Sequence, residues 1–375
     1  MNIDDIPIEL PYGKSRDRER QLIDFGKAIV AYTEAMEMHV SPRGWGYILV
    51  NKGKATKDQI DEVEKLIGQC LDKGYIPVDL IARDERREAQ GVEIPTDCNE
   101  REFVARWLGY VLRCEQAYIP DWFAGMDYYV QMMVEKVDLL TLFKPITDKY
   151  HIPIANDVGW SARLQRADFG KRFKEAEAHG LQCVLLYAGD YAPADVMIFN
   201  KLKKNYDDVK HQVWSDGTTG YDPKNLIVKR FALTKTQITD LHLPWIENLR
   251  TSSKGLDLAH STHNRHDEAW VQDWLNKVGS RMVEANALIT HPVEGRKICE
   301  DAIVHGVPAV DEDDVVIASE LWPGLGEDAL PKFEAKKRKV DNDIKEARRE
   351  SGLEATLQQW IGSLRDDISY GNEKS

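Results

Sequence analysis

The chain has 375 residues, of which 42% are hydrophobic and 30% are charged, and its formal net charge at pH 7 is −13. This is an ordinary composition for a globular protein of two or three domains. No run of about eighteen apolar residues occurs and the start, MNIDDIPIELPYGKSRDRER, has no apolar core, so we expect neither a spanning helix nor a secretory signal, and a cytoplasmic, intracellular location. Five cysteines without a Cys-x-x-Cys pair argue against a disulfide framework and a structural zinc site.

The first part of the chain predicts an irregular arm followed by helices. Residues 1–15 predict the arm, and apolar positions within 16–38 predict a helix. Ser41 and Pro42 are typical of a helix N-cap and of the first helical residue. They predict a short second helix through GWGYILV that ends near Gly53.

A third helix and a short strand complete this N-terminal domain. Thr56 and Gln59 have capping-box spacing and predict the start of a helix that ends at Gly74. The segment YIPVDLIA, 75–82, predicts a short strand. Three helices with a short β element fit a winged-helix-like DNA-binding domain over 16–83, and a small helical bundle is the alternative.

The middle of the chain predicts an α/β domain. Residues 84–126 are expected to form a linker and a connecting helix, and the pattern changes to alternating strands and helices over 127–305. Such alternation predicts a parallel sheet flanked by helices. Residues 306–375 predict a charged helical tail. Strands are expected at 128–134, 152–155, 182–188 and 226–233.

Two of these strands end at a carboxylate. YYVQMMVEK reaches Glu135, and QCVLLYAGD ends at Asp190. Ligands gather at the carboxyl ends of strands in an open parallel sheet. Two carboxylates at one rim would suit Mg²⁺ or another divalent cation, which points to phosphate chemistry.

The order of these motifs resembles the Toprim domain. The segments VEKVDLLTLFKPI, PIANDVGWSARL, LLYAGDYAPADVMI and KRFALTKTQITDLHLP resemble the group formed by the topoisomerase VI A subunit and the meiotic break-forming transesterases, and stand-alone Mini-A-like proteins above all. The resemblance covers roughly 16–305 and implies a Toprim fold, with Glu135 as acid/base or metal ligand and Mg²⁺ at Glu135 and Asp190. The EANAL segment adds a weaker match through Glu284.

One position departs from the family pattern. Ala192 stands where the family has its second aspartate, so Asp195 would have to reach the metal from a different position. The alternative interpretation is structural: Asp190 caps a turn and Glu135 pairs with Lys136 or another basic neighbour.

A second motif joins Arg43 and Tyr47 within RGWGYILV. Residues four apart share one face of a helix. By the resemblance, Tyr47 aligns with the tyrosine that attacks DNA, and Arg43 would hold the phosphate, forming a phosphotyrosine bond. The alternative is that Tyr47 is a core residue and Arg43 an exposed one. Gly44 and Gly46 also weaken the helix here.

The resemblance implies duplex DNA as the partner, with a homodimer to cut both strands because each copy carries one Tyr47. No Gly-Lys-Ser/Thr nucleotide loop is present, so ATP-driven strand passage would need a separate ATPase partner. The acidic net charge argues against DNA binding, unless a partner protein supplies some of the contacts to the phosphates. Two other functions remain: a Toprim nuclease using activated water, and a catalytically degenerate DNA-binding or assembly protein. The candidate DNA contacts are Arg163, Lys201, Lys203 and Lys204.

Overall fold

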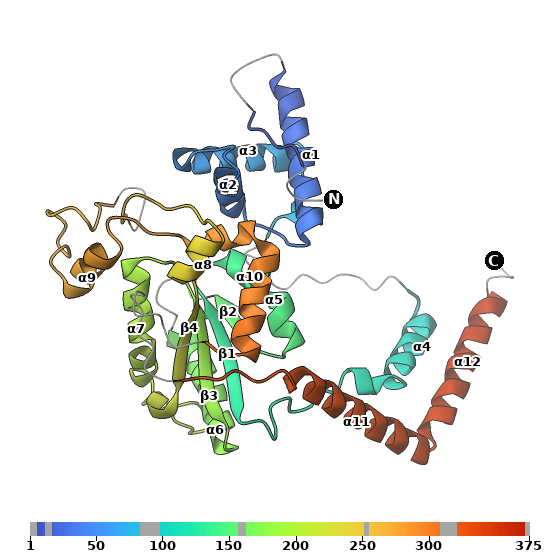
Figure 1. Cartoon of the computed structure of the whole chain (residues 1–375). Helices are drawn as coiled ribbons and strands as arrows, with labels where there is room; N and C mark the ends of the chain where they lie inside the picture. Colours follow the sequence, from blue (N-terminus) through green and yellow to red (C-terminus); the bar gives the residue numbers. More distant parts are fainter. Residues whose placement is uncertain are drawn as a thin grey trace. The chain divides into compact units, whose positions relative to one another are not determined.

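The computed structural model of the chain forms two compact units (Figure 1). Unit 1 combines two stretches of the chain, Met1–Glu85 and Gly125–Glu327. Unit 2 combines the two others, Arg86–Ala124 and Asp328–Ser375. The structure describes residues 6–11, 17–82, 98–156, 163–250, 255–307 and 321–371.

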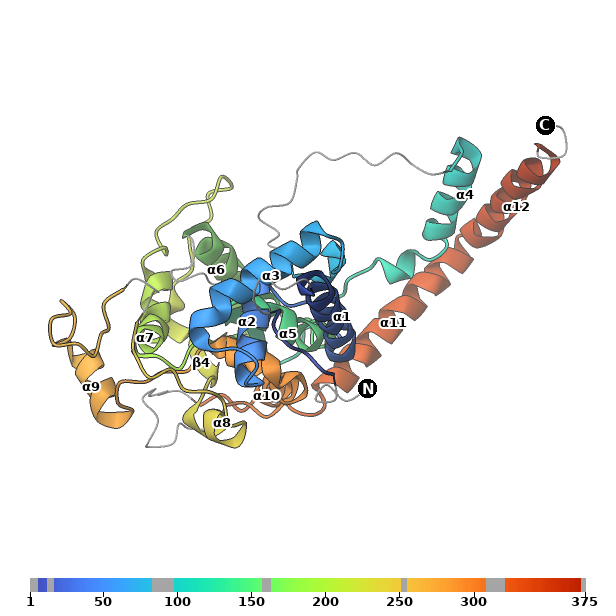
Figure 2. The same cartoon turned by 90° about the horizontal axis from the view of Figure 1, so that it is seen from above.

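The N-terminal part of unit 1 is a group of helices, seen together in Figure 2. Ser41 is the N-cap of the second helix as expected, because its hydroxyl accepts a hydrogen bond from the Gly44 N–H. The Thr56–Gln59 capping box is also present, although it opens a 3₁₀ turn before the third helix. The elements are α1 (Arg18–Met36), α2 (Pro42–Asn51), η2 (Lys57–Gln59) and α3 (Ile60–Asp72).

The strand predicted at 75–82 is wrong. This segment contains a 3₁₀ turn, η3 (Val78–Leu80), and pairs only through one isolated bridge between Val40 and Ile81. The apolar residues of the segment differ in burial: Ile76 is buried, whereas Val78 is exposed to solvent. One side of the segment therefore packs on the helices, and the described residues form no wing hairpin in this part of the chain.

The α/β class is confirmed: unit 1 holds a parallel four-stranded sheet with helices on both faces (Figure 1). The strand order is β2-β1-β3-β4. Because β2 lies on one side of β1 and β3 on the other, the chain reverses its direction of winding between β1 and β3. The strands are β1 (Tyr128–Val134), β2 (Ile154–Asn156), β3 (Gln182–Ala188) and β4 (Ile227–Ala232).

Helices cover both faces of this sheet, and the two central strands are almost fully buried. One face carries α5 (Val137–Lys149) and α10 (Pro292–Val304), which pack against each other. The other carries α6 (Arg163–Ala178) and α7 (Pro193–Asp207). The remaining elements of unit 1 are α8 (Lys235–Asp240), α9 (Ala269–Lys277) and the 3₁₀ helices η6 (Pro223–Asn225) and η7 (Ala285–Thr290).

Unit 2 joins two segments that the sequence predicted to be a linker and a tail. It contains α4 (Glu100–Val111), η5 (Cys114–Gln116), α11 (Ala329–Glu350) and α12 (Leu353–Gly371). Arg348 forms an ion pair of 2.9 Å with Glu115, and Phe333 packs edge-on against Phe123. The charged tail therefore has a partner inside its own unit.

No helix among the described residues is long and apolar enough to cross a membrane.

Candidate functional site

The structure brings Glu135 and Asp190 together at the carboxyl ends of the two central strands. Glu135 directly follows β1, and its N–H donates to the Ala188 carbonyl at the end of β3, 3.0 Å away. Asp190 follows β3 after Gly189, and its N–H donates to Glu135 Oε2 at 3.0 Å. This position lies between β1 and β3, where the winding reverses, which is the usual ligand position in open α/β sheets.

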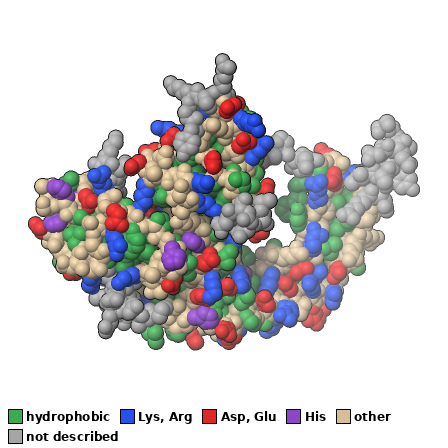
Figure 3. All heavy atoms as spheres, turned by 45° about the horizontal axis from the view of Figure 1, so that its top comes forward, with side chains coloured by type: hydrophobic (Ala, Val, Ile, Leu, Met, Phe, Trp, Pro, Cys, Tyr) green, Lys and Arg blue, Asp and Glu red, His purple; other side chains and the backbone are tan. Residues whose placement is uncertain are grey.

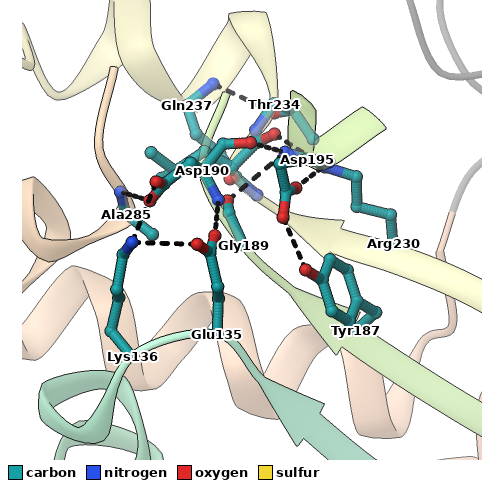
Figure 4. Close-up of polar contacts among 11 residues, drawn as sticks. Glu135, Lys136, Tyr187, Gly189, Asp190, Asp195, Arg230, Thr234, Gln237 and Ala285 are labelled. Carbon is teal, nitrogen blue, oxygen red and sulfur yellow. Dashed lines mark hydrogen bonds and ion pairs between the residues drawn. The ribbon is translucent and has the colours of Figure 1, made fainter. Parts of the chain in front are cut away.

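Lys136 lies between the two carboxylates (Figure 4). Its Nζ is 2.9 Å from Glu135 Oε1 and 3.0 Å from Asp190 Oδ2. Burial by itself would lower the pKa of Lys136, but attraction to Asp190 and Glu135 outweighs it and raises that pKa. Burial and repulsion from Glu135 raise the pKa of Asp190. The pairing of Glu135 with Lys136, one of the two interpretations of the sequence, is thus present.

Asp195 has a different environment from the one expected for a metal ligand. It lies in the first turn of α7, is buried, and forms an ion pair of 2.6 Å with Arg230 from β4. The Tyr187 hydroxyl donates a hydrogen bond to its other oxygen. Arg230 also donates to the backbone carbonyl of Asp190. Asp195 therefore organises the buried side of the rim (Figure 4).

These carboxylates do not fit a divalent cation in this arrangement. The position between Glu135 and Asp190 is filled by an ammonium group, and Asp195 is balanced by Arg230. Within the described ranges, no three His, Cys, Asp or Glu side chains are grouped as a metal site.

Tyr47 and Arg43 share one face of α2, as their spacing predicts. The Arg43 Cζ lies 5.9 Å from the centroid of the Tyr47 ring. Arg43 is more than half exposed and pairs with Glu64 at 3.4 Å, whereas Tyr47 is only 8% exposed. The helix that carries them packs on α3 and on η7, so Tyr47 faces the α/β part of unit 1.

Glu284 connects Tyr47 with the rim of the sheet. It directly precedes η7, which packs on α2, the helix of Tyr47. Burial and the Glu284 carboxylate raise the pKa of Tyr47, while Arg43 lowers it. The charge of Glu284 also acts on Lys136 and Asp190. A candidate nucleophile and the strand-end carboxylates therefore belong to one polar cluster.

Sequence reasoning left several members of this cluster out of the candidate site. Glu284 was visible only as the weak EANAL match, and Lys136 only as a structural partner of Glu135. Lys57, whose Nζ is buried without a hydrogen-bond partner among the described residues, lies near Glu284 and had no signal of its own. Nothing in the sequence distinguishes Arg230 from the other basic residues, and only the fold shows its ion pair with Asp195.

The basic residues expected to contact DNA lie apart from the rim. Lys201, Lys203 and Lys204 are in the second half of α7, and a helical rise of about 1.5 Å per residue puts them roughly 9–14 Å along the axis from Asp195. Arg163 begins α6, but its side chain lies outside the described residues, as does the Gly-Trp-Ser segment before it. Basic and acidic side chains are interspersed on the face drawn in Figure 3.

Comparisons with family models, with curated proteins and with solved structures give no match to this chain. The Toprim resemblance therefore rests on two things: the sequence motifs given above and the parallel sheet that carries them.

Proposed function

We propose that this protein binds DNA and cleaves it by transesterification through Tyr47, the function implied by its resemblance to the topoisomerase VI A group. One observation carries the proposal. The η7 segment, which Glu284 directly precedes, packs on α2, the helix of Tyr47, and the Ala285 N–H of η7 donates to Asp190 Oδ1 at 2.8 Å. The candidate nucleophile and the reversal point of the sheet thus contribute to one site within one compact unit.

The proposed reaction uses these side chains directly. The raised pKa of Tyr47 keeps the phenol protonated at neutral pH, so attack needs a base, and Glu284 is placed to accept the proton. The Tyr47 oxygen then forms a bond to phosphorus, and one bond from phosphorus to a deoxyribose oxygen breaks. The Lys57 ammonium protonates that leaving oxygen, while Arg43 stabilises the charge of the phosphate.

Each copy of the chain carries one Tyr47, so a cut through both strands of duplex DNA needs two copies. A homodimer is therefore part of the proposal. Lys201, Lys203, Lys204 and Arg163 are its proposed contacts to the phosphate backbone. ATP-driven strand passage would need a separate ATPase partner.

A second candidate, a DNA-binding or assembly protein without catalysis, is favoured by a specific observation. Tyr47 is only 8% exposed, and Lys136 closes the gap between Glu135 and Asp190. Most of the Tyr47 side chain is therefore covered, as a purely structural role for this tyrosine would have it.

Trapping a covalent adduct between the protein and DNA distinguishes the two candidate functions. Labelled duplex DNA is incubated with the protein, with Mg²⁺ or with EDTA, and stopped with denaturant. A labelled polypeptide on a denaturing gel is the expected product, and it should vanish in Tyr47→Phe because the phosphate acceptor is gone. Tyr32→Phe is the matched control, since Tyr32 is buried in the same helical part and its hydroxyl has no hydrogen-bond partner among the described residues.

The other outcomes favour other functions. DNA cutting that survives Tyr47→Phe and is lost in Glu135→Ala would indicate a nuclease that uses activated water. DNA binding without an adduct or a cut, with Mg²⁺ or with EDTA, would indicate the non-catalytic protein. A loss of the adduct in Tyr32→Phe as well would show that packing of the helices, rather than the Tyr47 hydroxyl, is responsible.

A further inference from the structure

Every carboxylate oxygen of the strand-end pair already has a partner within the chain. Glu135 Oε2 accepts a hydrogen bond from the Asp190 N–H at 3.0 Å, and Glu135 Oε1 pairs with Lys136 Nζ at 2.9 Å. Asp190 Oδ1 accepts a hydrogen bond from the Ala285 N–H at 2.8 Å, and Asp190 Oδ2 pairs with Lys136 Nζ at 3.0 Å. Each carboxylate thus uses one oxygen for a backbone amide and the other for the same ammonium group (Figure 4).

The carboxylates of the buried rim also have cations of this chain as partners. Carboxylates removed from water are costly unless cations pair with them. Asp195 has Arg230 at 2.6 Å, and both side chains are at most 3% exposed. Glu135 and Asp190 share Lys136, and their side chains are 16% and 14% exposed. Ala192 stands in the place of a further carboxylate, so three carboxylates share two cations, Lys136 and Arg230, at this rim.

The geometry points to Lys136 as the resident cation of this site: its ammonium group takes the position between Glu135 and Asp190 that a divalent metal ion would occupy. Ammonium and metal compete for the same two oxygens, Glu135 Oε1 and Asp190 Oδ2. The native protein therefore does not bind a divalent cation at these carboxylates. This inference rests on the carboxylate geometry and holds whether or not Tyr47 attacks DNA.

Manganese binding tests the inference without any reaction. The full-length protein is titrated with Mn²⁺, and free Mn²⁺ is followed by electron paramagnetic resonance. The native protein should leave the Mn²⁺ signal undiminished. Lys136→Met removes the competing charge and frees both oxygens, so it should bind one equivalent of Mn²⁺, and Lys136→Met combined with Asp190→Asn should lose that binding. Lys144→Met is the control, because Lys144 is an exposed lysine of α5 that pairs with the exposed Asp148 one turn further on.

Several outcomes would overturn the inference. One is stoichiometric Mn²⁺ binding by the native protein that disappears in Asp190→Asn, since the metal would then displace Lys136. Another is a folded Lys136→Met that binds no Mn²⁺, since the lysine would then not be what excludes the cation. If Lys136→Met fails to fold, Lys136→Gln replaces it, with thermal unfolding with and without Mn²⁺ as a second measurement. Failure of the DNA adduct assay would leave these results unaffected.

Discussion

Ser41 and Asp138 are joined by two hydrogen bonds although 97 positions separate them in the sequence. Asp138 Oδ1 accepts from the Ser41 N–H and Oδ2 from the Ser41 hydroxyl, each at 3.0 Å. The same hydroxyl accepts the Gly44 N–H at the start of α2. Asp138 lies in the first turn of α5, so this pair attaches the helix of Tyr47 to the element that follows Glu135 and Lys136.

Replacing Ser41 with Ala should therefore cost more than the loss of an ordinary helix cap. The N-cap contributes about 1 kcal/mol, and a buried acceptor left without its donor costs about 1–3 kcal/mol more. Asp138 is 2% exposed, and burial raises the pKa of its carboxyl group. We expect the free energy of unfolding to fall by about 2 kcal/mol or more in urea denaturation.

Thr56→Ala is the matched control for this substitution. Thr56 is also an N-cap, but it is exposed and its capping box has no buried partner. A loss of about 1 kcal/mol is expected for Thr56→Ala. If Ser41→Ala proves no more costly than Thr56→Ala, the link to Asp138 contributes nothing.

Local sequence signals predicted the elements that carry the site. The N-cap at Ser41 and the capping box of Thr56 and Gln59 are present, because capping depends on residues within three positions of each other. The strands ending near Glu135 and Asp190 are at the expected positions, because each is a buried apolar run ended by polar residues. The parallel order of the sheet follows from the alternating elements.

Contacts between distant segments could not be predicted in the same way. The packing of α2, which carries Tyr47, on η7 and the ion pair of Arg230 with Asp195 depend on how distant elements meet. Lys136 is adjacent to Glu135, yet only the position of Asp190 on the neighbouring strand makes it a bridge. The expected strand at 75–82 failed because tertiary packing overrode its β-branched residues.

A second prediction concerns the glycines of α2. A Cβ on Gly46 would lie 2.7 Å from Ile60 Cγ2, too close for a carbon contact. Gly46→Ala should therefore destabilise the protein by about 1–3 kcal/mol, although Ala is the better helix former by about 1 kcal/mol. Gly68→Ala in α3 is the control, since nothing lies within 4 Å of its Cβ, and it should stabilise by up to about 1 kcal/mol. Urea denaturation of both variants decides, and equal effects of the two would contradict close packing of α2 on α3.

The buried pair of Asp195 and Arg230 gives a third prediction. Arg230→Met leaves a buried carboxylate without its cation and should lower the free energy of unfolding by about 3–5 kcal/mol. The double variant Arg230→Met with Asp195→Leu should recover part of that loss, because no lone charge remains. Lys144→Met breaks an exposed pair with Asp148 and should change stability by less than about 1 kcal/mol. A double variant less stable than Arg230→Met alone would count against a stabilising role for charge balance.

The fourth prediction uses the buried ammonium group of Lys57. Burial lowers the pKa of Lys57 to about 8, and Glu284 and Glu247 offset only part of that effect. Below pH about 8 the group is charged in both the folded and the unfolded chain, so the folded state bears the full cost of burial. Between pH about 8 and 10.5 the folded state loses the proton first and the cost is relieved. Lys57→Met should therefore stabilise the protein at pH 7 by about 1 kcal/mol, after allowance for solvent screening, and by less as the pH rises toward 10.

Urea denaturation of the native protein and of Lys57→Met at pH 7 and near pH 10 measures this difference. Exposed Lys65 on α3 provides the control, because Lys65→Met removes the same charge without removing a buried one. Its effect should be small and constant over this range. If the advantage of Lys57→Met stays the same at both pH values, the Lys57 ammonium does not titrate early in the folded state. Lys57 would then be a poor candidate for the group that protonates a leaving oxygen at neutral pH.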